Sequence, residues 1–151
     1  MHFTKDLYNK IEKNNNIRYI TLHIGSGTFK PIEVQDIKQH NMHFEYYDIP
    51  SSSIDVIDSN SKILAVGTTA TRAIESYVRG RKSKCDTNLF LHLDNKPKRV
   101  DYLVTNFHLP KSSLLVLVSS FIGLEKSKEI YQEAIKQGYR FYSYGDGMLI
   151  I

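Results

Sequence analysis

The sequence predicts an α/β fold in which a β-sheet is flanked by helices, and three observations lead to this prediction. A compact apolar run at 62–67 ends in Gly67 and precedes a stretch with apolar residues at helical spacing. Apolar or alternating segments of strand length lie on both sides of this unit, with turn residues between them. With 41% hydrophobic and 24% charged residues among 151, the chain can bury a core. We therefore expect one α/β unit over residues 1–151.

The first half of the chain is expected to hold two helices and three strands. Apolar residues recur at helical spacing after Thr4, whose side chain can accept a hydrogen bond from the first turn. An aromatic-rich segment stops at Pro50, as a strand would. In chain order, the predicted elements are a helix over 5–13, strands over 17–24 and 44–49, a helix over 54–58 and a buried strand over 62–67.

The second half is expected to alternate in the same way and to end in an apolar tail. Ser112 can cap a helix, and Gly123 can end it in a left-handed conformation. The aromatic segment 139–148 leads to three apolar residues, 149–151, which we expect to be buried. In chain order, the predicted elements are a helix after Gly67, strands over 89–93 and 100–104, and helices over 112–121 and 125–137.

The cysteine content and the hydropathy of the chain indicate the cellular compartment in which the protein is expected. A single cysteine, Cys85, cannot form an internal disulfide, and the N-terminus lacks the charged, apolar and cleavable pattern of a signal peptide. The longest apolar run, 114–118, is far shorter than the roughly 20 residues of a membrane span. We expect a cytoplasmic protein without a membrane-spanning segment.

The net charge of +4 permits a polyanionic partner without demonstrating one. Basic side chains gather in two short stretches, and these can contact phosphates or form a solvated surface. The two clusters are Arg79, Arg81, Lys82 and Lys84, followed by Lys96, Lys98 and Arg99.

Two glycine-containing segments follow predicted strands. Gly25 and Gly27 leave backbone amides uncovered, as a cradle for an anion or ribose-phosphate requires, although an ordinary turn has the same composition. Thr68 and Thr69 follow Gly67 between a strand and a helix, where ligands of open α/β sheets gather. Arg72 would point from the first helical turn toward that crevice, unless it is a surface arginine.

Histidines and tail residues are the other candidates for chemistry. His43, near His40 and Glu45, has neither helical His pairing nor a nearby cysteine, so no metal site is expected. His108 lies in a loop between a strand and a capped helix, where it can do chemistry or simply fill the core. Tyr142, Tyr144 and Asp146 can stack a base, hold a ribose hydroxyl or pack the C-terminus.

Taken together, these segments resemble the S-adenosylmethionine:tRNA ribosyltransferase-isomerase family, which acts in queuosine biosynthesis. Five stretches match the family in the expected order, and the match covers nearly the whole chain. They are Thr21 to Pro31, His43 to Tyr47, Ala65 to Ser76, Thr105 to Ser112, and Tyr139 to Met148. Leu93-Asp94-Asn95 stands where family members commonly carry an aromatic Pro-Gly turn.

The resemblance implies a mixed β-sheet flanked by helices, corresponding to the C-terminal part of the family's core domain without its inserted β-barrel. The N-terminal part of that core is expected to be missing, because Met1-His2-Phe3 resembles an interior segment of the family. A separately encoded N-terminal half would then be a partner. A noncatalytic remnant and a generic nucleic-acid-binding module are the alternatives.

The implied reaction transfers the ribosyl group of S-adenosylmethionine to the aminomethyl-deazaguanine base of tRNA and isomerises it, giving epoxyqueuosine with release of adenine and methionine. The cosubstrate is consumed, and the tRNA would be bound around its anticodon, with the basic clusters as phosphate contacts. His43 or His108 would transfer the proton. The residues expected to bind S-adenosylmethionine are Gly25, Gly27, Thr68, Thr69, Arg72, Tyr144 and Asp146.

Overall fold

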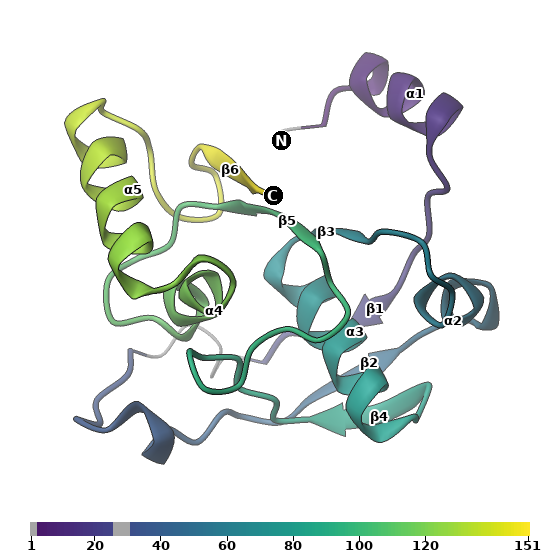
Figure 1. Ribbon diagram of the computed structural model, residues 1–151, viewed down its shortest axis with the longest axis horizontal. Coiled ribbons are helices and arrows are strands. Elements are labelled where there is room, and N and C mark those ends of the chain that lie inside the picture. Colours follow the sequence, from purple (N-terminus) through teal and green to yellow (C-terminus); the bar gives the residue numbers. More distant parts are fainter. Residues whose placement is uncertain (1–2, 26–30) are drawn as a thin grey trace.

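The computed structural model describes residues 3–25 and 31–151, and its elements alternate between helices and strands (Figure 1). The helices of these residues are α1 (Lys5–Asn14), α2 (Ser51–Ile57), α3 (Thr68–Gly80), α4 (Ser113–Ile122) and α5 (Leu124–Lys136), with a 3-10 turn, η2 (Ile37–Gln39). The strands are β1 (Thr21–Leu22), β2 (Glu45–Asp48), β3 (Leu64–Val66), β4 (Lys84–Thr87), β5 (Tyr102–Asn106) and β6 (Gly147–Ile150). The predicted α/β class is confirmed.

The strands form two small sheets rather than one. β1, β2 and β4 make an antiparallel sheet in that order. The second sheet has the order β3-β5-β6 and is mixed, because β3 runs parallel to β5 while β6 runs antiparallel to it. The register pairs Val66 with Val104, and Asn106 with Gly147.

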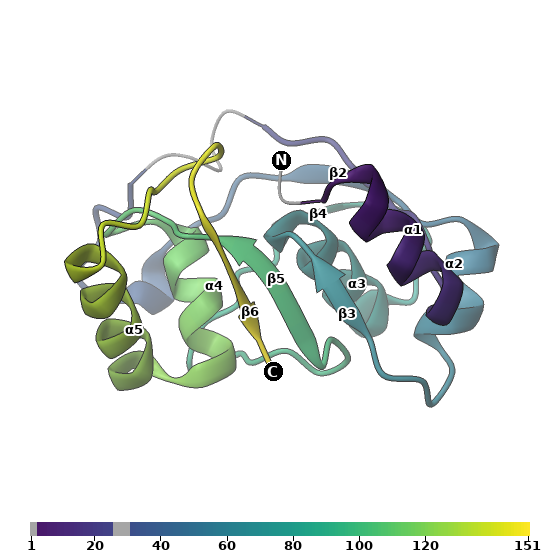
Figure 2. The same ribbon diagram turned by 90° about the horizontal axis from the view of Figure 1, so that it is seen from above.

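The core lies between the two sheets and the helices that cover them. α3 and α4 lie on one side of the β3-β5-β6 sheet (Figure 2). Their buried Ala73 and Val118 belong to one apolar cluster with Leu103 on β5 and Tyr47 on β2. Burying such side chains contributes about 1.5 to 3 kcal/mol each relative to exposure, so this cluster is the main source of the fold's stability.

Local signals placed most helix ends correctly. The Thr4 side chain accepts a hydrogen bond from the Leu7 amide at 3.2 Å, and the Ser112 side chain accepts one from Leu115 at 3.1 Å. Gly123, at φ +84°, separates α4 from α5. The helix predicted over 54–58 begins earlier, at Ser51, directly after Pro50.

No helix of the described ranges is long and apolar enough to cross a membrane.

The strand predicted over 89–93 is wrong, and a strand over 84–87 was not anticipated. The backbone carbonyls of Leu89 and Phe90 accept hydrogen bonds from side chains instead of from a neighbouring strand. The donors are the Arg72 side chain to Leu89 and the Asn95 side chain to Phe90. β4 begins at Lys84, the last residue of a basic stretch whose composition is typical of a loop. Its pairing with β2 depends on a neighbour far away in sequence, which local pattern does not show.

Two further strand predictions needed adjustment. Of the strand expected over 17–24, only Thr21 and Leu22 are paired. The segment 62–67 was expected to be buried, yet Leu64 and Val66 are 47% and 52% exposed because β3 is packed on one face only. The sequence also predicts that the extended chain resumes at Phe29 after the glycine segment, and this position lies outside the described residues.

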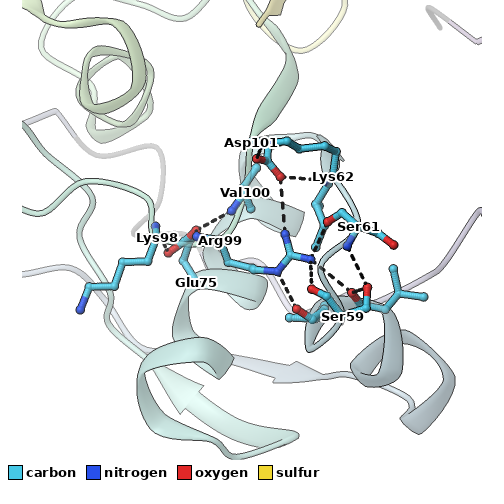
Figure 3. A network of polar contacts seen from close by, with 11 residues as sticks. Ser59, Ser61, Lys62, Glu75, Lys98, Arg99, Val100 and Asp101 are labelled. Carbon is cyan, nitrogen blue, oxygen red and sulfur yellow. Dashed lines mark hydrogen bonds and ion pairs between the residues drawn. The ribbon is translucent and has the colours of Figure 1, made fainter.

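Glu75 ties α3 to the segment that leads into β5 (Figure 3). Its side chain is fully buried and accepts hydrogen bonds from the backbone amides of Lys98, Arg99 and Val100 at 2.8 to 2.9 Å. Arg79 completes the arrangement with an ion pair. A buried carboxylate is tolerated only when its oxygens are bonded in this way.

Replacing Glu75 with glutamine is expected to lower the free energy of unfolding by about 2 to 4 kcal/mol, because an amide group cannot accept all these bonds and leaves buried donors unpaired. Urea unfolding of the chain measures the loss. The matched control is Glu129→Gln, which removes a carboxylate from an exposed ion pair with Lys126 and should leave the unfolding midpoint unchanged. Equal midpoints for both variants would contradict the role of Glu75.

Candidate functional site

One edge of the β3-β5-β6 sheet gathers three of the sequence motifs. β3 and β5 are parallel, so their carboxyl ends lie at the same edge, and β6 begins there because it runs the other way. Gly67 follows β3, the loop from Phe107 to Pro110 follows β5, and Asp146 precedes β6. Ligands of open α/β sheets bind beyond the carboxyl ends of the strands, which makes this edge the candidate site.

Hydrogen bonds join the loop after β5 to the aromatic tail. The Phe107 amide donates to the Asp146 carbonyl at 3.1 Å, and the Tyr142 amide donates to the Phe107 carbonyl at 3.1 Å. The Asn106 side chain donates to the Gly145 carbonyl at 3.2 Å. These bonds hold the end of β5 and the start of β6 together, although the two segments are far apart in the sequence.

The tail makes a tight turn in which Gly145 is required. A Cβ atom at this buried position would overlap the carbonyl groups of Arg140 and Phe141. Asp146 closes the same turn, since its carboxylate accepts from the Arg140 amide at 2.8 Å and from the Arg140 guanidinium at 2.9 Å. Tyr144 lies at the tip of the turn with 95% of its surface exposed. The carboxylate thus holds the turn in shape, and the ring is presented to solvent.

Arg72 is buried one turn into α3, and only 3% of its surface is exposed. Its guanidinium forms an ion pair with Glu45 and donates from Nε to the Leu89 carbonyl at 3.1 Å. Burial lowers the pKa of Arg72, and the charge of Glu45 opposes that effect. The second terminal nitrogen, Nη2, is buried and has no hydrogen-bond partner among the described residues. A buried donor without a partner is costly, which marks a place where a ligand can supply an acceptor.

Glu45 connects Arg72 to the glycine segment. While one oxygen pairs with Arg72, the other accepts a hydrogen bond from the Gly25 amide at 3.0 Å. Gly27 lies outside the described residues. Beyond that gap, Pro31 bridges to Ser112, and the Ile32 amide donates to the Lys111 carbonyl at 2.7 Å. The glycine segment is therefore anchored to β2 before the gap and to the start of α4 after it.

Glu45 was weighed only as a metal ligand from the sequence. The available signal was its strand position, since Glu45, Tyr47 and Ile49 alternate on one buried face and a buried acid needs a cationic partner. Within the ranges that the structure describes, no group of three or more His, Cys, Asp or Glu side chains is arranged to hold a metal ion.

Thr68 and Thr69 begin α3 directly after Gly67. Gly67 has a φ of +94°, which a glycine adopts without strain, and its carbonyl accepts a hydrogen bond from the Thr71 side chain at 3.1 Å. Thr68 is buried, while Thr69 is half-buried. The exposed amides of a first helical turn suit a negatively charged or hydroxyl-bearing ligand.

His108 is held at the same edge in an uncharged state. Its Nε2 atom lies 2.8 Å from the Thr105 hydroxyl, and its backbone amide donates to the Tyr131 hydroxyl at 3.1 Å. Burial lowers the pKa of His108 from 6.5 to about 4 and raises the pKa of Tyr131 to about 12. At neutral pH, His108 can accept a proton but carries none to donate as a cation.

His43 is the candidate that the geometry does not bring to this edge. It is exposed in the segment before β2. Its charge contributes, after burial, to lowering the pKa of the neighbouring His40. Within the described part of the chain, Arg72 and Gly25 contact Glu45, two positions later, rather than His43.

Several members of the two basic clusters are bound within the protein. Arg79 pairs with Glu75, Arg81 with Asp58, and Lys84 with Asp48. Arg99 donates to four backbone carbonyls that connect it to the end of α2 and the following loop. These side chains hold neighbouring elements together, so a simple count of basic residues overstates the charge available to a partner.

The fold is that of an α/β protein, with a candidate ligand site beyond the parallel strands of a small mixed sheet. Residues 1–150 match the family model described as "Queuosine biosynthesis protein", and the chain belongs to this family. It is 58% identical over 151 residues to the S-adenosylmethionine:tRNA ribosyltransferase-isomerase of a Nitratiruptor species and 57% identical to that of Aliarcobacter butzleri. All of this chain is covered in both cases, and 44% of each relative.

A solved structure shares the fold. The crystal structure of S-adenosylmethionine tRNA ribosyltransferase from Thermotoga maritima matches with a TM-score of 0.79 at 36% identity, covering 99% of this chain and 50% of that one. The chain thus spans less than half the length of the curated relatives it matches, which fits the expected C-terminal portion.

Folding stability is expected to fall as the pH drops from about 6.5 to about 4. The unfolded chain takes up a proton on His108 through this window, whereas the folded chain keeps the ring neutral until about pH 4. Urea unfolding at a series of pH values measures this slope, and His108→Gln should reduce it. His23→Gln, at an exposed histidine, is the control and should leave it unchanged. The same slope in both variants would contradict the assignment.

Gly145→Ala is expected to lower the free energy of unfolding by about 1 to 3 kcal/mol, because the added methyl group overlaps two carbonyl groups of the tail turn. Gly80→Ala at the end of α3 is the matched control, since a Cβ atom there meets no atom within 4 Å. Thermal unfolding followed by circular dichroism compares the two. A Gly145 variant as stable as the Gly80 variant would show that the turn adjusts freely.

Proposed function

We propose that this chain supplies part of the active site of a cytoplasmic S-adenosylmethionine:tRNA ribosyltransferase-isomerase. The reaction transfers the ribosyl group of S-adenosylmethionine to the aminomethyl-deazaguanine base of tRNA and isomerises it to epoxyqueuosine, releasing adenine and methionine. S-adenosylmethionine is a consumed substrate in this proposal, and no metal ion takes part.

One observation carries the proposal. The helix α3 starts at the sheet edge where three sequence motifs converge, and one turn into it Arg72 is buried with a nitrogen that has no hydrogen-bond partner among the described residues. Glu45 and Leu89 hold the guanidinium of Arg72, which fixes the direction in which its remaining nitrogen can donate a hydrogen bond. An acceptor such as the methionine carboxylate or a ribose hydroxyl of S-adenosylmethionine would satisfy it.

The neighbouring residues suit the remaining parts of the cosubstrate. Thr68 and Thr69 offer hydroxyl groups and helix amides. In the proposal, the segment with Gly25 and Gly27 contacts the cosubstrate as well. Tyr144 provides an exposed ring against which a base can stack. Asp146 supports the turn that carries this ring, and in the proposal its carboxylate also anchors a ribose hydroxyl.

The chemistry requires a base that removes a proton from the carbon beside the sulfonium, whose positive charge acidifies it. The uncharged His108 suits this base better than the acid that protonates the departing adenine, because its pKa of about 4 leaves it unprotonated at neutral pH. His43 remains the other proton-transfer candidate. In the proposal it approaches the site only when the rest of the enzyme and the tRNA are bound.

The tRNA would be held around its anticodon by the lysines of the two basic clusters that form no ion pair among the described residues. Lys82, Lys96 and Lys98 are these side chains. Lysine contacts of this kind position phosphates without reading the base sequence.

The second candidate function is that of a complementing subunit or a noncatalytic remnant. The chain covers only 44% of its curated relatives, and an active site assembled from two parts loses its geometry when one part is absent. A separately encoded N-terminal half would restore it.

Adenine release from S-adenosylmethionine and tRNA carrying the aminomethyl-deazaguanine base tests the proposal. We expect release when this chain is combined with the portion of the Nitratiruptor relative that it does not span. Release by the chain alone would place the whole active site in these residues. No release in either case, from folded protein, would favour the remnant.

Arg72→Lys is expected to reduce kcat/KM for adenine release in that complete assembly by about 10- to 100-fold. Lysine keeps the charge opposite Glu45 but loses the planar donor set, and a charge-assisted hydrogen bond contributes about 1.5 to 3 kcal/mol. Arg81→Lys, at an exposed arginine paired with Asp58, is the control. Unchanged turnover in a folded Arg72 variant would remove Arg72 from the site.

A further inference from the structure

One face of the β3-β5-β6 sheet is apolar and uncovered. The register places Val66 beside Val104, and Val104 beside Leu149, in a row across all three strands. Leu64 and Tyr102 form a second row. Leu149 is 58% exposed, about as much as Leu64 and Val66 on the opposite edge strand. Contiguous apolar surface of this kind marks an interaction site.

The same strands are also apolar on their other face. Ala65, Leu103 and Ile150 alternate with the exposed residues and are buried in the core. Strands with apolar residues on both faces are typical of a sheet that lies between two layers. Figure 2 shows one such layer, formed by α3 and α4, and no helix of the described residues over the opposite face.

The apolar side chains of α1 are also uncovered, and α1 lies on the same side of the molecule. The helix is amphipathic, yet none of its residues is buried, and Leu7 on it is exposed. Figure 1 shows α1 standing away from the body of the protein, and Figure 2 shows it on the side toward which the uncovered sheet face is turned. Isolated helices of this length are marginal in water, so α1 depends on packing for its stability.

The two outer strands of the sheet, β3 and β6, also have unpaired sides among the described residues. In the described part of the chain, β3 and β6 each have β5 as their one neighbour. Open edges present unpaired backbone groups that other strands can bind, and three strands are few for a sheet with two apolar faces.

We propose that the uncovered face, defined by Leu64, Val66, Tyr102, Val104 and Leu149, together with α1, docks the part of the family's chain that these 151 residues do not span. The relatives at 57% and 58% identity contain this whole chain within a polypeptide more than twice as long. A segment of the same polypeptide is present at high effective concentration, which favours it over a second copy as the occupant. The occupant supplies the missing layer over the sheet.

The experiment compares cysteine labelling at this face in two forms of the protein. Leu149→Cys is placed in this chain alone and in a single polypeptide that joins it to the complementary portion of the Nitratiruptor relative. We expect maleimide labelling of residue 149 to be at least about tenfold slower in the joined form, because a covered side chain reacts only when the docked layer opens. Mass spectrometry of the peptide separates this signal from that of Cys85.

Glu133→Cys on α5 is the matched control, because the Glu133 side chain is 56% exposed and α5 lies beside the sheet rather than over its uncovered face (Figure 2). Its labelling should be equally fast in both forms. Equal rates for residue 149 in the two forms would overturn the proposal, and so would concentration-dependent protection in the chain alone, which would assign the face to a second copy. If the joined polypeptide fails to fold, the full-length relative with cysteine at the aligned position replaces it.

This outcome is independent of catalysis. Protection of residue 149 in a joined protein that releases no adenine would support the docking surface and contradict the proposed function. Adenine release without protection of residue 149 would support the proposed function and contradict the docking surface.

Discussion

Two buried charges on α3 hold the two sheets to one helix. Arg72 pairs with Glu45 on β2, and Glu75, one turn later, binds the backbone amides that lead into β5. Each charge is almost completely removed from water, so each requires its partners to remain in place. The positions of β2 and β5 relative to α3 are therefore fixed by polar contacts as well as by the apolar core.

The candidate site depends on this arrangement. Because β3 leads directly into α3, the first turn of the helix, the end of β5 and the start of β6 meet at one edge. Glu45 extends the connection to the glycine segment through the Gly25 amide. The residues nearest the proposed chemistry are held rigidly, whereas the face on the other side of the same sheet lacks a covering layer among the described residues. The candidate site thus lies beyond the carboxyl ends of β3 and β5, and the proposed docking surface lies on the uncovered face of the same sheet.

Sequence reasoning was most reliable where the signal is local. The caps of α1 and α4, the glycine between α4 and α5, and the unit of β3 and α3 could all be predicted from neighbouring residues. It failed where backbone partners are distant. Residues 89–93 look like a strand, but the side chains of Arg72 and Asn95 donate hydrogen bonds to carbonyls of this segment. Residues 84–87, at the end of a basic stretch, become a strand because β2 lies beside them.

The sequence by itself determined the α/β class, most helix boundaries and the family resemblance, because these depend on local periodicity, capping and motif order. Only the tertiary structure decided that Glu45 serves Arg72, that Arg79 and Arg99 hold the fold together, and that His108 is uncharged. It also decided that β3, which has apolar residues on both faces, is covered by other elements on only one face in the described part of the chain. The physical reason is the same throughout: burial and pairing depend on residues far away in the chain, and no local pattern records which partner is present.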